Sequence, residues 1–224
     1  MNKFFLNLGR QPLANNYLRT FKKDQRKYNL KLYFDTKSKL VSISKRIPSK
    51  QMFNSKYPYR SSMSKTMKKS FNNLASKIKK KIKPNMMLEI GSNDGVLIQN
   101  FNKKNVIGVE PCKNLAKITM KKGFKTYCEY WNFKLAKKLK KIHGNVDLIY
   151  SSNTLTHISD LSNVLKSINY LLSNNGILII EDPSLMECLK KNSYDQFYNE
   201  HIYLFSAISV KNLLKKFNLT IFEI

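Results

Sequence analysis

The clearest indication of the fold is the segment Met87-Leu88-Glu89-Ile90-Gly91-Ser92-Asn93-Asp94-Gly95-Val96-Leu97. Its apolar run predicts a buried strand, and Gly91 and Gly95 allow the chain to turn tightly and to approach a ligand closely. The polar residues between the two glycines are of the types that cap a following helix. Because doubly wound α/β sheets bind nucleotides beyond the carboxyl ends of their strands, the segment predicts a ligand-binding loop that leads into a helix.

The pattern continues on the C-terminal side of this segment. Apolar runs that predict strands lie at 86–91, 106–110, 146–151, 176–181 and 219–224, with a weaker run at 124–128. Helical patterns lie between them at 113–122, 132–142, 161–173 and 207–217. Continuous apolar strands that alternate with helices indicate a mostly parallel sheet covered on both faces, so we expect a doubly wound α/β fold.

The N-terminal part of the chain has a different character. Residues 1–62 contain three prolines and no sustained helical period, so they read as loops and short strands. From Met63, apolar residues recur at spacings of three and four and stop before Pro84. We therefore expect an N-terminal appendage at 1–62, a linker helix at 63–83 and the α/β domain at 84–224.

The composition is strongly basic. The 224 residues include 41 Lys and Arg against 14 Asp and Glu, a formal charge of +27. Such a charge suggests a nucleic-acid partner, because basic side chains neutralise phosphates. Only five of the basic residues are Arg, however, and Asn occurs 25 times, which is the bias of an AT-rich coding sequence. We favour coding bias and keep nucleic-acid binding as the alternative.

The cysteines and the hydropathy pattern exclude other classes. Three widely separated cysteines form no CxxC motif or His/Cys cluster, so neither a disulfide framework nor a zinc site is expected. No run of about 18 apolar residues is present, so no membrane span is expected. Both features favour a soluble, cytoplasmic protein.

The pattern E-x-G-x-N-x-G at 89–95 resembles the first motif of class I S-adenosylmethionine-dependent methyltransferases. Glu110 ends the second strand, 21 residues beyond Glu89, where a carboxylate can accept hydrogen bonds from both ribose hydroxyls. The alternative is an ordinary tight turn followed by a surface glutamate. The resemblance implies a Rossmann-like sheet, S-adenosylmethionine as cofactor, and a cofactor site formed by Glu89, Gly91, Ser92, Asn93, Gly95, Glu110, Pro111 and Asn153. Asn153 has the equal alternative of capping the next helix.

Further stretches resemble the sugar C-methyltransferases, which methylate the carbon beside the ketone of nucleotide-linked 4-keto-deoxysugars. In chain order they are Leu8–Asn15 (LGRQPLAN), Met52-Phe53, Tyr57–Ser62 (YPYRSS), the 89–95 loop, Gly108–Pro111 (GVEP), Asn153–His157 (NTLTH) and Tyr198–Ser206 (YNEHIYLFS). They follow the order of that family over nearly the whole chain. The resemblance implies a nucleotide-sugar substrate.

Carbon methylation beside a ketone needs a base for the α proton, and histidine suits this role near neutral pH. By the resemblance, His201 is this base, Tyr198 and Glu200 orient it or contact the sugar, and His157 hydrogen-bonds substrate. Tyr59 or Tyr57 closes the site from the appendage. We place both His157 and His201 just after predicted strands, at the sheet edge. The alternatives are capping histidines and packing tyrosines, the latter being the better reading of Tyr57.

The sequence departs from the sugar C-methyltransferases at both ends. The two cysteine pairs that bind structural zinc in that family have no counterpart, so no zinc is expected. The chain stops on a run that matches the sixth strand, without the hairpin and C-terminal domain of the family. We therefore expect a truncated chain or a partner chain that completes it. Two alternatives to sugar methylation stay open: an RNA methyltransferase that uses the lysine surface, and an inactive subunit that binds cofactor only.

Overall fold

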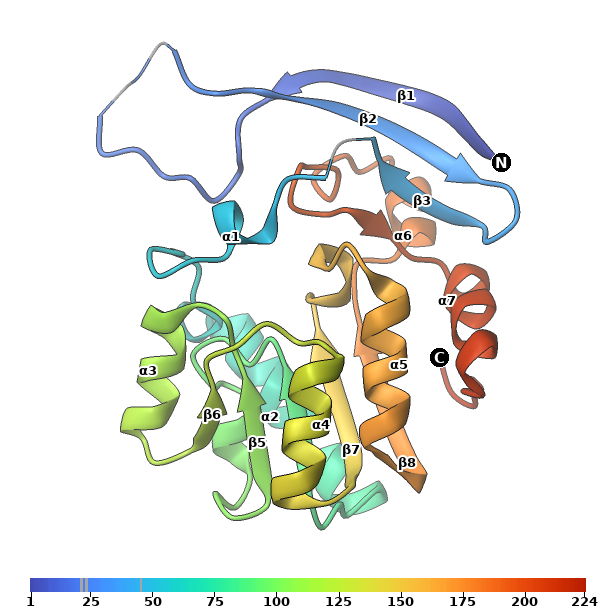
Figure 1. Cartoon of the computed structure of the whole chain (residues 1–224). Coiled ribbons are helices and arrows are strands. Elements are labelled where there is room, and N and C mark those ends of the chain that lie inside the picture. Colours follow the sequence, from blue (N-terminus) through green and yellow to red (C-terminus); the bar gives the residue numbers. More distant parts are fainter. Residues whose placement is uncertain (21, 23, 45) are drawn as a thin grey trace. The chain divides into compact units, whose positions relative to one another are not determined.

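The computed structural model describes residues 1–20, 22, 24–44 and 46–224. The chain divides into two compact units, each built from separated segments (Figure 1). Unit 1 contains residues 1–52, 153–161 and 182–224, and unit 2 contains residues 53–152 and 162–181. The C-terminal residues that the sequence assigns to the α/β domain therefore group with the N-terminal residues.

Unit 2 is built on a parallel sheet of five strands. These are β4 (Met87–Ile90), β5 (Val106–Val109), β6 (Lys125–Tyr127), β7 (Val146–Ser152) and β8 (Leu172–Glu181), in the order β6-β5-β4-β7-β8. At the carboxyl edge, Ile90 pairs with Val109 on one side and with Ser151 on the other. The side chains of β4 and β5 are all buried, as expected for strands covered on both faces.

Four helices cover this sheet: α2 (Lys65–Lys81), α3 (Lys113–Lys121), α4 (Phe133–His143) and α5 (Leu161–Leu171), the last beginning at the final residue of a unit 1 segment. The apolar stripe of α2 packs Phe71, Ala75 and Ile78 into one core with β4 and β7. In Figure 1, α4 and α5 lie side by side in front of the sheet. The backbone N–H of Phe133 donates to the Asn163 side chain between these two helices.

The sequence predicts this unit well. The α/β class with a parallel sheet is confirmed, and so are the five strands expected between residues 86 and 181, including the weak run at 124–128. The helix expected at 63–83 is present as α2, which begins at a Ser64 cap that accepts a hydrogen bond from the Met67 N–H. Alternation of continuous apolar runs with helical periods is a strong signal because the two periodicities differ clearly from each other.

Unit 1 contains an antiparallel sheet that the sequence predicts only as short strands and loops. Its strands are β1 (Asn2–Gln11), β2 (Tyr28–Asp35), β3 (Leu40–Ile43) and β9 (Tyr203–Leu204), in that order. The strand β1 is long but is exposed along nearly all of its length. A strand that buries neither face has no apolar alternation, so its length could not be read from the sequence.

The helices of unit 1 are short. They are α1 (Ser49–Met52), η3 (Leu155–His157), α6 (Leu185–Lys190), α7 (Ala207–Leu214) and η4 (Lys215–Phe217). Val41, Cys188 and Leu204 form a small core between the sheet and α6. Among the described residues, no helix has the length and hydrophobicity that a membrane crossing requires.

The strand expected at 219–224 is wrong, because these residues form no strand. Phe222 and Ile224 are largely exposed. An apolar run becomes a strand only beside a hydrogen-bonded neighbour, and β8 ends the parallel sheet on that side without one among the described residues.

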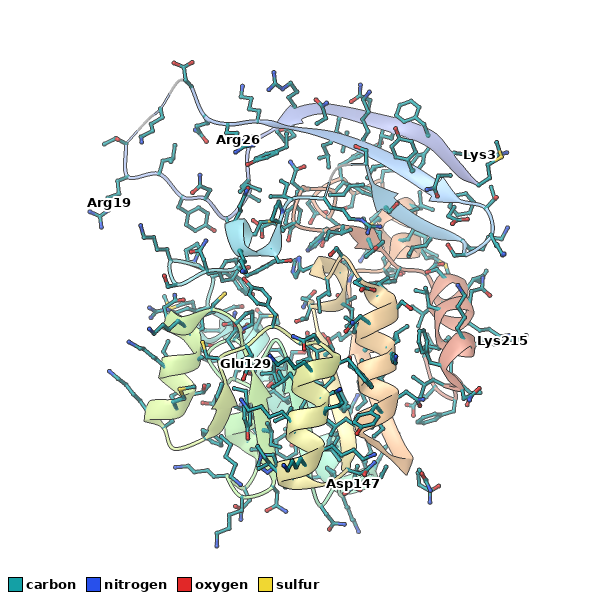
Figure 2. The ribbon with its side chains drawn as sticks, viewed as in Figure 1. Lys3, Arg19, Arg26, Glu129, Asp147 and Lys215 are labelled. Carbon is teal, nitrogen blue, oxygen red and sulfur yellow. The ribbon has the colours of Figure 1, made fainter. Side chains whose placement is uncertain are left out.

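The basic side chains are spread over both units rather than gathered in one place. Figure 2 labels exposed cations as far apart in the chain as Lys3 on β1, Arg19 and Arg26 on the loop that follows it, and Lys215 after α7. Exposed lysines also line α2, α3 and α4 of unit 2. This spread is consistent with the coding bias inferred from the composition.

Candidate functional site

The residues expected to bind cofactor lie mainly in unit 2, where β4 ends. Gly91, Asn93 and Gly95 all adopt positive φ, at 73°, 49° and 83°. The N–H groups of Gly91 and Ser92 both donate to the carbonyl oxygen of Val109, at 2.8 and 3.1 Å. The loop thus folds back against β5 and brings the end of β4 beside Glu110.

Gly95 is required by packing as well as by its backbone conformation. A Cβ atom at this position would lie 2.3 Å from Cγ2 of Thr119 on α3. The loop and α3 can therefore approach this closely only with glycine here.

Glu110 organises the loop through both carboxylate oxygens. Oε2 accepts from the N–H of Asn93 at 2.9 Å, and Oε1 accepts from the N–H of Cys112 at 2.8 Å. Pro111 lies between Glu110 and Cys112 in the chain. Burial raises the pKa of Glu110, and the hydrogen bonds from Cys112 and Asn93 oppose that shift. Each oxygen retains a lone pair that can accept from a ligand.

Glu89 is the second buried carboxyl group of this loop. Burial raises its pKa well above the ordinary value, and the negative charges of Glu110 and Asp94 act in the same direction. Glu89 Oε2 and Ser92 Oγ are buried and have no hydrogen-bond partner among the described residues. Buried acceptors without donors are destabilising, so these two atoms indicate where a ligand would supply hydrogen bonds.

The capping role expected for the loop is wrong in detail. The loop leads only into η2 (Ile98–Asn100), a single 3-10 turn, and no α-helix follows it directly. Instead, the Asn93 and Asp94 side chains accept from the N–H groups of Ser61 and Ser62, in a segment 32 residues earlier. Sequence adjacency suggested the wrong donors, because the N–H groups that bind these two side chains belong to residues distant in the chain.

Three other expected residues of the site are placed as follows. Tyr59 belongs to unit 2, and its carbonyl oxygen accepts from Asn93 Nδ2 at 3.4 Å while its side chain is half exposed. Tyr57 is buried against Cys112 and Leu115, which supports its reading as a packing residue. Asn153 directly follows β7 with φ of 46°, and the N-cap of η3 is its neighbour Thr154.

The expected catalytic residues come together within unit 1. The hydroxyl group of Tyr198 lies 2.6 Å from His201 Nε2, and the rings of His157 and His201 are 5.0 Å apart between centroids. His157 Nδ1 lies 2.8 Å from the carbonyl oxygen of Glu200. His201 lies just before β9, far beyond the end of β8, so the expectation that it follows that strand directly is wrong.

The hydrogen bonds of His201 fix its tautomer. Nδ1 lies 2.9 Å from the carbonyl oxygen of Gln196, which can only accept, so Nδ1 carries the proton. In the neutral ring, Nε2 then presents its lone pair to the Tyr198 hydroxyl. Burial lowers the pKa of His201 to about 3, with His157 acting in the same direction. Burial likewise lowers the pKa of His157 to about 4. Both imidazoles are therefore neutral near pH 7.

Glu200 makes a contact that the sequence did not reveal. Its two carboxylate oxygens accept from the backbone N–H of Asn15 at 3.0 Å and from the Asn15 side-chain amide at 2.6 Å. Asn199 Nδ2 donates to the carbonyl oxygen of Gln11 in the same stretch. The LGRQPLAN and YNEHIYLFS stretches are thus hydrogen-bonded to each other. The signal was the presence of both in one resemblance, but spacing alone could not pair them.

No cluster of three or more His, Cys, Asp or Glu side chains is arranged to hold a metal ion, as far as the described residues extend. The three cysteines are free thiols, of which Cys112 and Cys188 are buried. Burial raises the pKa of Cys112, and the nearby Glu110 carboxylate adds to the effect.

Comparison with known proteins places these features in a family. A family described as a methyltransferase domain matches residues 59–224. The C-methyltransferase NovU of Streptomyces niveus is 30% identical over 141 residues, which are 62% of this chain and 34% of NovU. The chain therefore spans about a third of the length of this curated relative.

Solved structures agree on the fold. The plantazolicin methyltransferase BamL, solved with SAH and a triazolic desmethylPZN analog, has a TM-score of 0.55 at 16% identity, covering 70% of this chain and 65% of its own. A SAM dependent methyltransferase from Archaeoglobus fulgidus has a TM-score of 0.52 at 16% identity, covering 66% and 68%. At these identities the likeness concerns the fold alone.

The loop of unit 2 fits the cofactor of this family. S-adenosylmethionine carries a sulfonium, an ammonium group and ribose hydroxyls but no phosphate, so it needs acceptors and negative charge rather than a phosphate cradle. Glu89 Oε2, Ser92 Oγ and the remaining lone pairs of Glu110 supply buried acceptors beside one turn. The chain therefore belongs to the methyltransferase-domain family, a family whose cofactor is S-adenosylmethionine.

Proposed function

We propose that this methyltransferase transfers the methyl group to carbon, next to the ketone of a nucleotide-linked 4-keto-deoxysugar. The observation that carries the proposal is the buried, neutral His201 with its Nε2 lone pair directed at Tyr198. The resemblance of seven short stretches to sugar C-methyltransferases supports the substrate class, and the similarity to a C-methyltransferase supports carbon as the acceptor atom.

His201 acts as the base in this proposal. The bond from carbon to the α hydrogen breaks, its electron pair forms the enolate, and the proton ends on His201 Nε2. Because Tyr198 donates to Nε2 in the resting protein, its oxygen takes the substrate proton while its own proton passes to the imidazole. The low pKa keeps His201 unprotonated beforehand, and the enolate charge stabilises the imidazolium once it has formed.

Other residues of unit 1 hold His201 and Tyr198 in place. Gln196 fixes the tautomer through its carbonyl oxygen, and Glu200 holds the segment that contains Asn15 by accepting two hydrogen bonds. Both carboxylate oxygens of Glu200 accept from Asn15, so we assign Glu200 to positioning of this segment rather than to contact with the sugar. His157, anchored at Nδ1 by the Glu200 carbonyl group, is assigned to hydrogen bonding with substrate.

The residues of unit 2 provide the cofactor site. We assign Glu110 to the ribose hydroxyls, and Gly91, Ser92, Asn93, Gly95 and Pro111 to the loop that shapes the site. Glu89 and Tyr59 complete the set in unit 2, with Tyr59 covering the cofactor loop, and Asn153, which belongs to unit 1, keeps its cofactor assignment from the resemblance alone. When bound, S-adenosylmethionine supplies an electrophilic methyl group on a sulfonium centre.

Methyl transfer to a sugar nucleotide tests the proposal. We expect the purified chain, given S-adenosylmethionine and a thymidine-diphosphate-linked 4-keto-6-deoxyhexose, to yield a product heavier by one methyl-for-hydrogen replacement. Carbon NMR should show the new methyl group bonded to the ring carbon beside the ketone. A product methylated on oxygen, or no product from a chain that binds S-adenosylhomocysteine in calorimetry, would reject the substrate class while leaving the cofactor site intact.

A further inference from the structure

Residues 53–63 form a strap within unit 2 that has no regular structure before η1 (Ser61–Met63). Its first half is fastened at two carbonyl groups. The hydroxyl group of Tyr130 donates to the Phe53 carbonyl oxygen at 2.5 Å, and Asn114 Nδ2 donates to that of Tyr57 at 2.8 Å. The Tyr57 ring is also buried, so this half is fixed by packing independently of the cofactor loop.

The second half of the strap is held by the cofactor loop itself. Asn93 Oδ1 accepts from the N–H of Ser61 at 3.0 Å, and Asp94 Oδ1 accepts from that of Ser62 at 3.3 Å. Asn93 Nδ2 donates to the carbonyl oxygen of Tyr59. The first N–H groups of a helix have no partner within it, and the residue before η1 makes no side-chain cap. The loop therefore supplies the cap of η1 from a distant part of the chain.

Asn93 is the residue that joins the two regions. Its own N–H donates to the Glu110 carboxylate, while its side chain holds both Tyr59 and Ser61. Asn93 has a φ of 49°, a left-handed conformation that asparagine tolerates better than most residues. A ligand that hydrogen-bonds to Glu110 therefore affects Asn93, which donates to Glu110 and also holds the strap.

We infer that Asn93 is a positioning residue that couples occupancy of the cofactor loop to the placement of Tyr59. A glycine at this position would shape the turn equally well but would hold nothing. The side chain thus has a role beyond that of the loop backbone. This inference rests on the proposed function only for the role of Tyr59, and its test needs no sugar substrate.

Amide hydrogen exchange of the strap, measured with and without S-adenosylhomocysteine, tests the coupling. We expect the ligand to slow exchange at residues 59–63 in the wild-type chain. In Asn93→Gly, which keeps the backbone conformation, these amides should exchange about tenfold faster and lose the ligand-dependent slowing, as expected for two lost hydrogen bonds. Because coupling between two sites is reciprocal, affinity for the ligand should fall by about the same factor as the ligand-dependent slowing that is lost, while the hydrogen bond from the Asn93 N–H to Glu110 remains. Asn218→Gly, at another left-handed asparagine, is the matched control and should leave the strap unchanged.

The same hydrogen bond can be removed from the other side. Ser61 is the first residue of η1 and the preceding residue is extended, with φ of −127° and ψ of 121°, so proline fits at position 61 and removes the backbone donor together with the serine hydroxyl. Ser61→Pro should also release residues 59–63, and the double variant with Asn93→Gly should add little to either single change. Asn93→Asp keeps the acceptor for the Ser61 N–H but loses the Nδ2 donor to Tyr59, so it should restore the protection at Ser61 only.

Three results would overturn the coupling: unchanged strap exchange in Asn93→Gly, ligand-dependent slowing that survives both substitutions, or fully additive effects in the double variant. If Asn93→Gly does not fold, Ser61→Pro decides alone, because it leaves the cofactor loop intact. Failure of the wild-type chain to bind S-adenosylhomocysteine would contradict the cofactor site instead, and the ligand-free exchange rates would still decide whether Asn93 holds the strap.

Discussion

Replacing His201 by asparagine is expected to slow exchange of the α proton of a 4-keto-deoxysugar nucleotide by about a thousandfold, the scale of a lost general base. Asparagine retains polarity and approximate size but has no basic nitrogen. Affinity for S-adenosylhomocysteine should stay within about twofold, because His201 belongs to unit 1 and makes none of the hydrogen bonds of the cofactor loop. Deuterium incorporation from heavy water, followed by proton NMR, measures the exchange directly.

The chain offers a matched control for this variant. His143 makes the same kind of pair, with its Nε2 2.8 Å from the hydroxyl group of Tyr127, but it lies at the C-terminal end of α4 in unit 2. His143→Asn should leave the exchange rate at the wild-type value. Equal exchange in wild type and His201→Asn would remove His201 from the role of base, whereas equal losses in both variants would point to a general effect on folding.

Replacing Glu110 by glutamine is expected to weaken binding of S-adenosylhomocysteine by about a hundredfold, or about 2.7 kcal/mol. The carboxylate accepts from the N–H groups of Asn93 and Cys112, so an amide in its place turns an NH₂ group against one of these donors. The variant therefore disturbs the loop and loses an acceptor for ribose. Isothermal titration calorimetry measures the affinity, with thermal melting to confirm that the variant is folded.

A ligand lacking one ribose hydroxyl separates these two contributions. Its affinity should fall for the wild-type chain but should change little further for Glu110→Gln, because the acceptor is already lost. Glu129→Gln is the control: Glu129 is an exposed carboxylate on the same unit, paired with Lys138, and its loss should not change affinity. An unchanged dissociation constant for Glu110→Gln would contradict the cofactor site described for unit 2.

The fold of unit 2 could be predicted from the sequence because burial on both faces turns each parallel strand into a continuous apolar run. The same logic failed at both ends of the chain. The exposed strand β1 gives no apolar alternation, while the apolar run at 219–224 joins neither sheet among the residues that the structure describes. Whether a segment pairs is a property of the fold rather than of local composition.

The residues of the candidate site also differ in whether the sequence could identify them. Gly91, Gly95 and Glu110 could be identified because a turn with positive φ and a carboxylate at a strand end leave a recognisable spacing. The partners of Glu200 and Asn93 could not, since Asn15 and Ser61 lie 185 and 32 residues away. Hydrogen bonds between distant loops leave no period in the sequence, so only the structure reveals that Glu200 and Asn93 hold other segments.

His201 is expected to be a neutral imidazole protonated at Nδ1, with Nε2 available as a base. A depressed pKa means that the folded chain resists protonation, whereas the unfolded chain binds the proton near its ordinary pKa of about 6.5. Stability should therefore fall as pH drops below about 6.5, and the imidazole itself should stay neutral until pH nears the folded pKa of about 3. Nitrogen-15 NMR of histidine-labelled protein, assigned with His201→Asn, measures both the tautomer and the titration. We predict an Nδ1–H signal that is unchanged from about pH 8 to about pH 5. A titration midpoint of His201 near 6.5, or a proton on Nε2 of its neutral ring, would contradict this assignment.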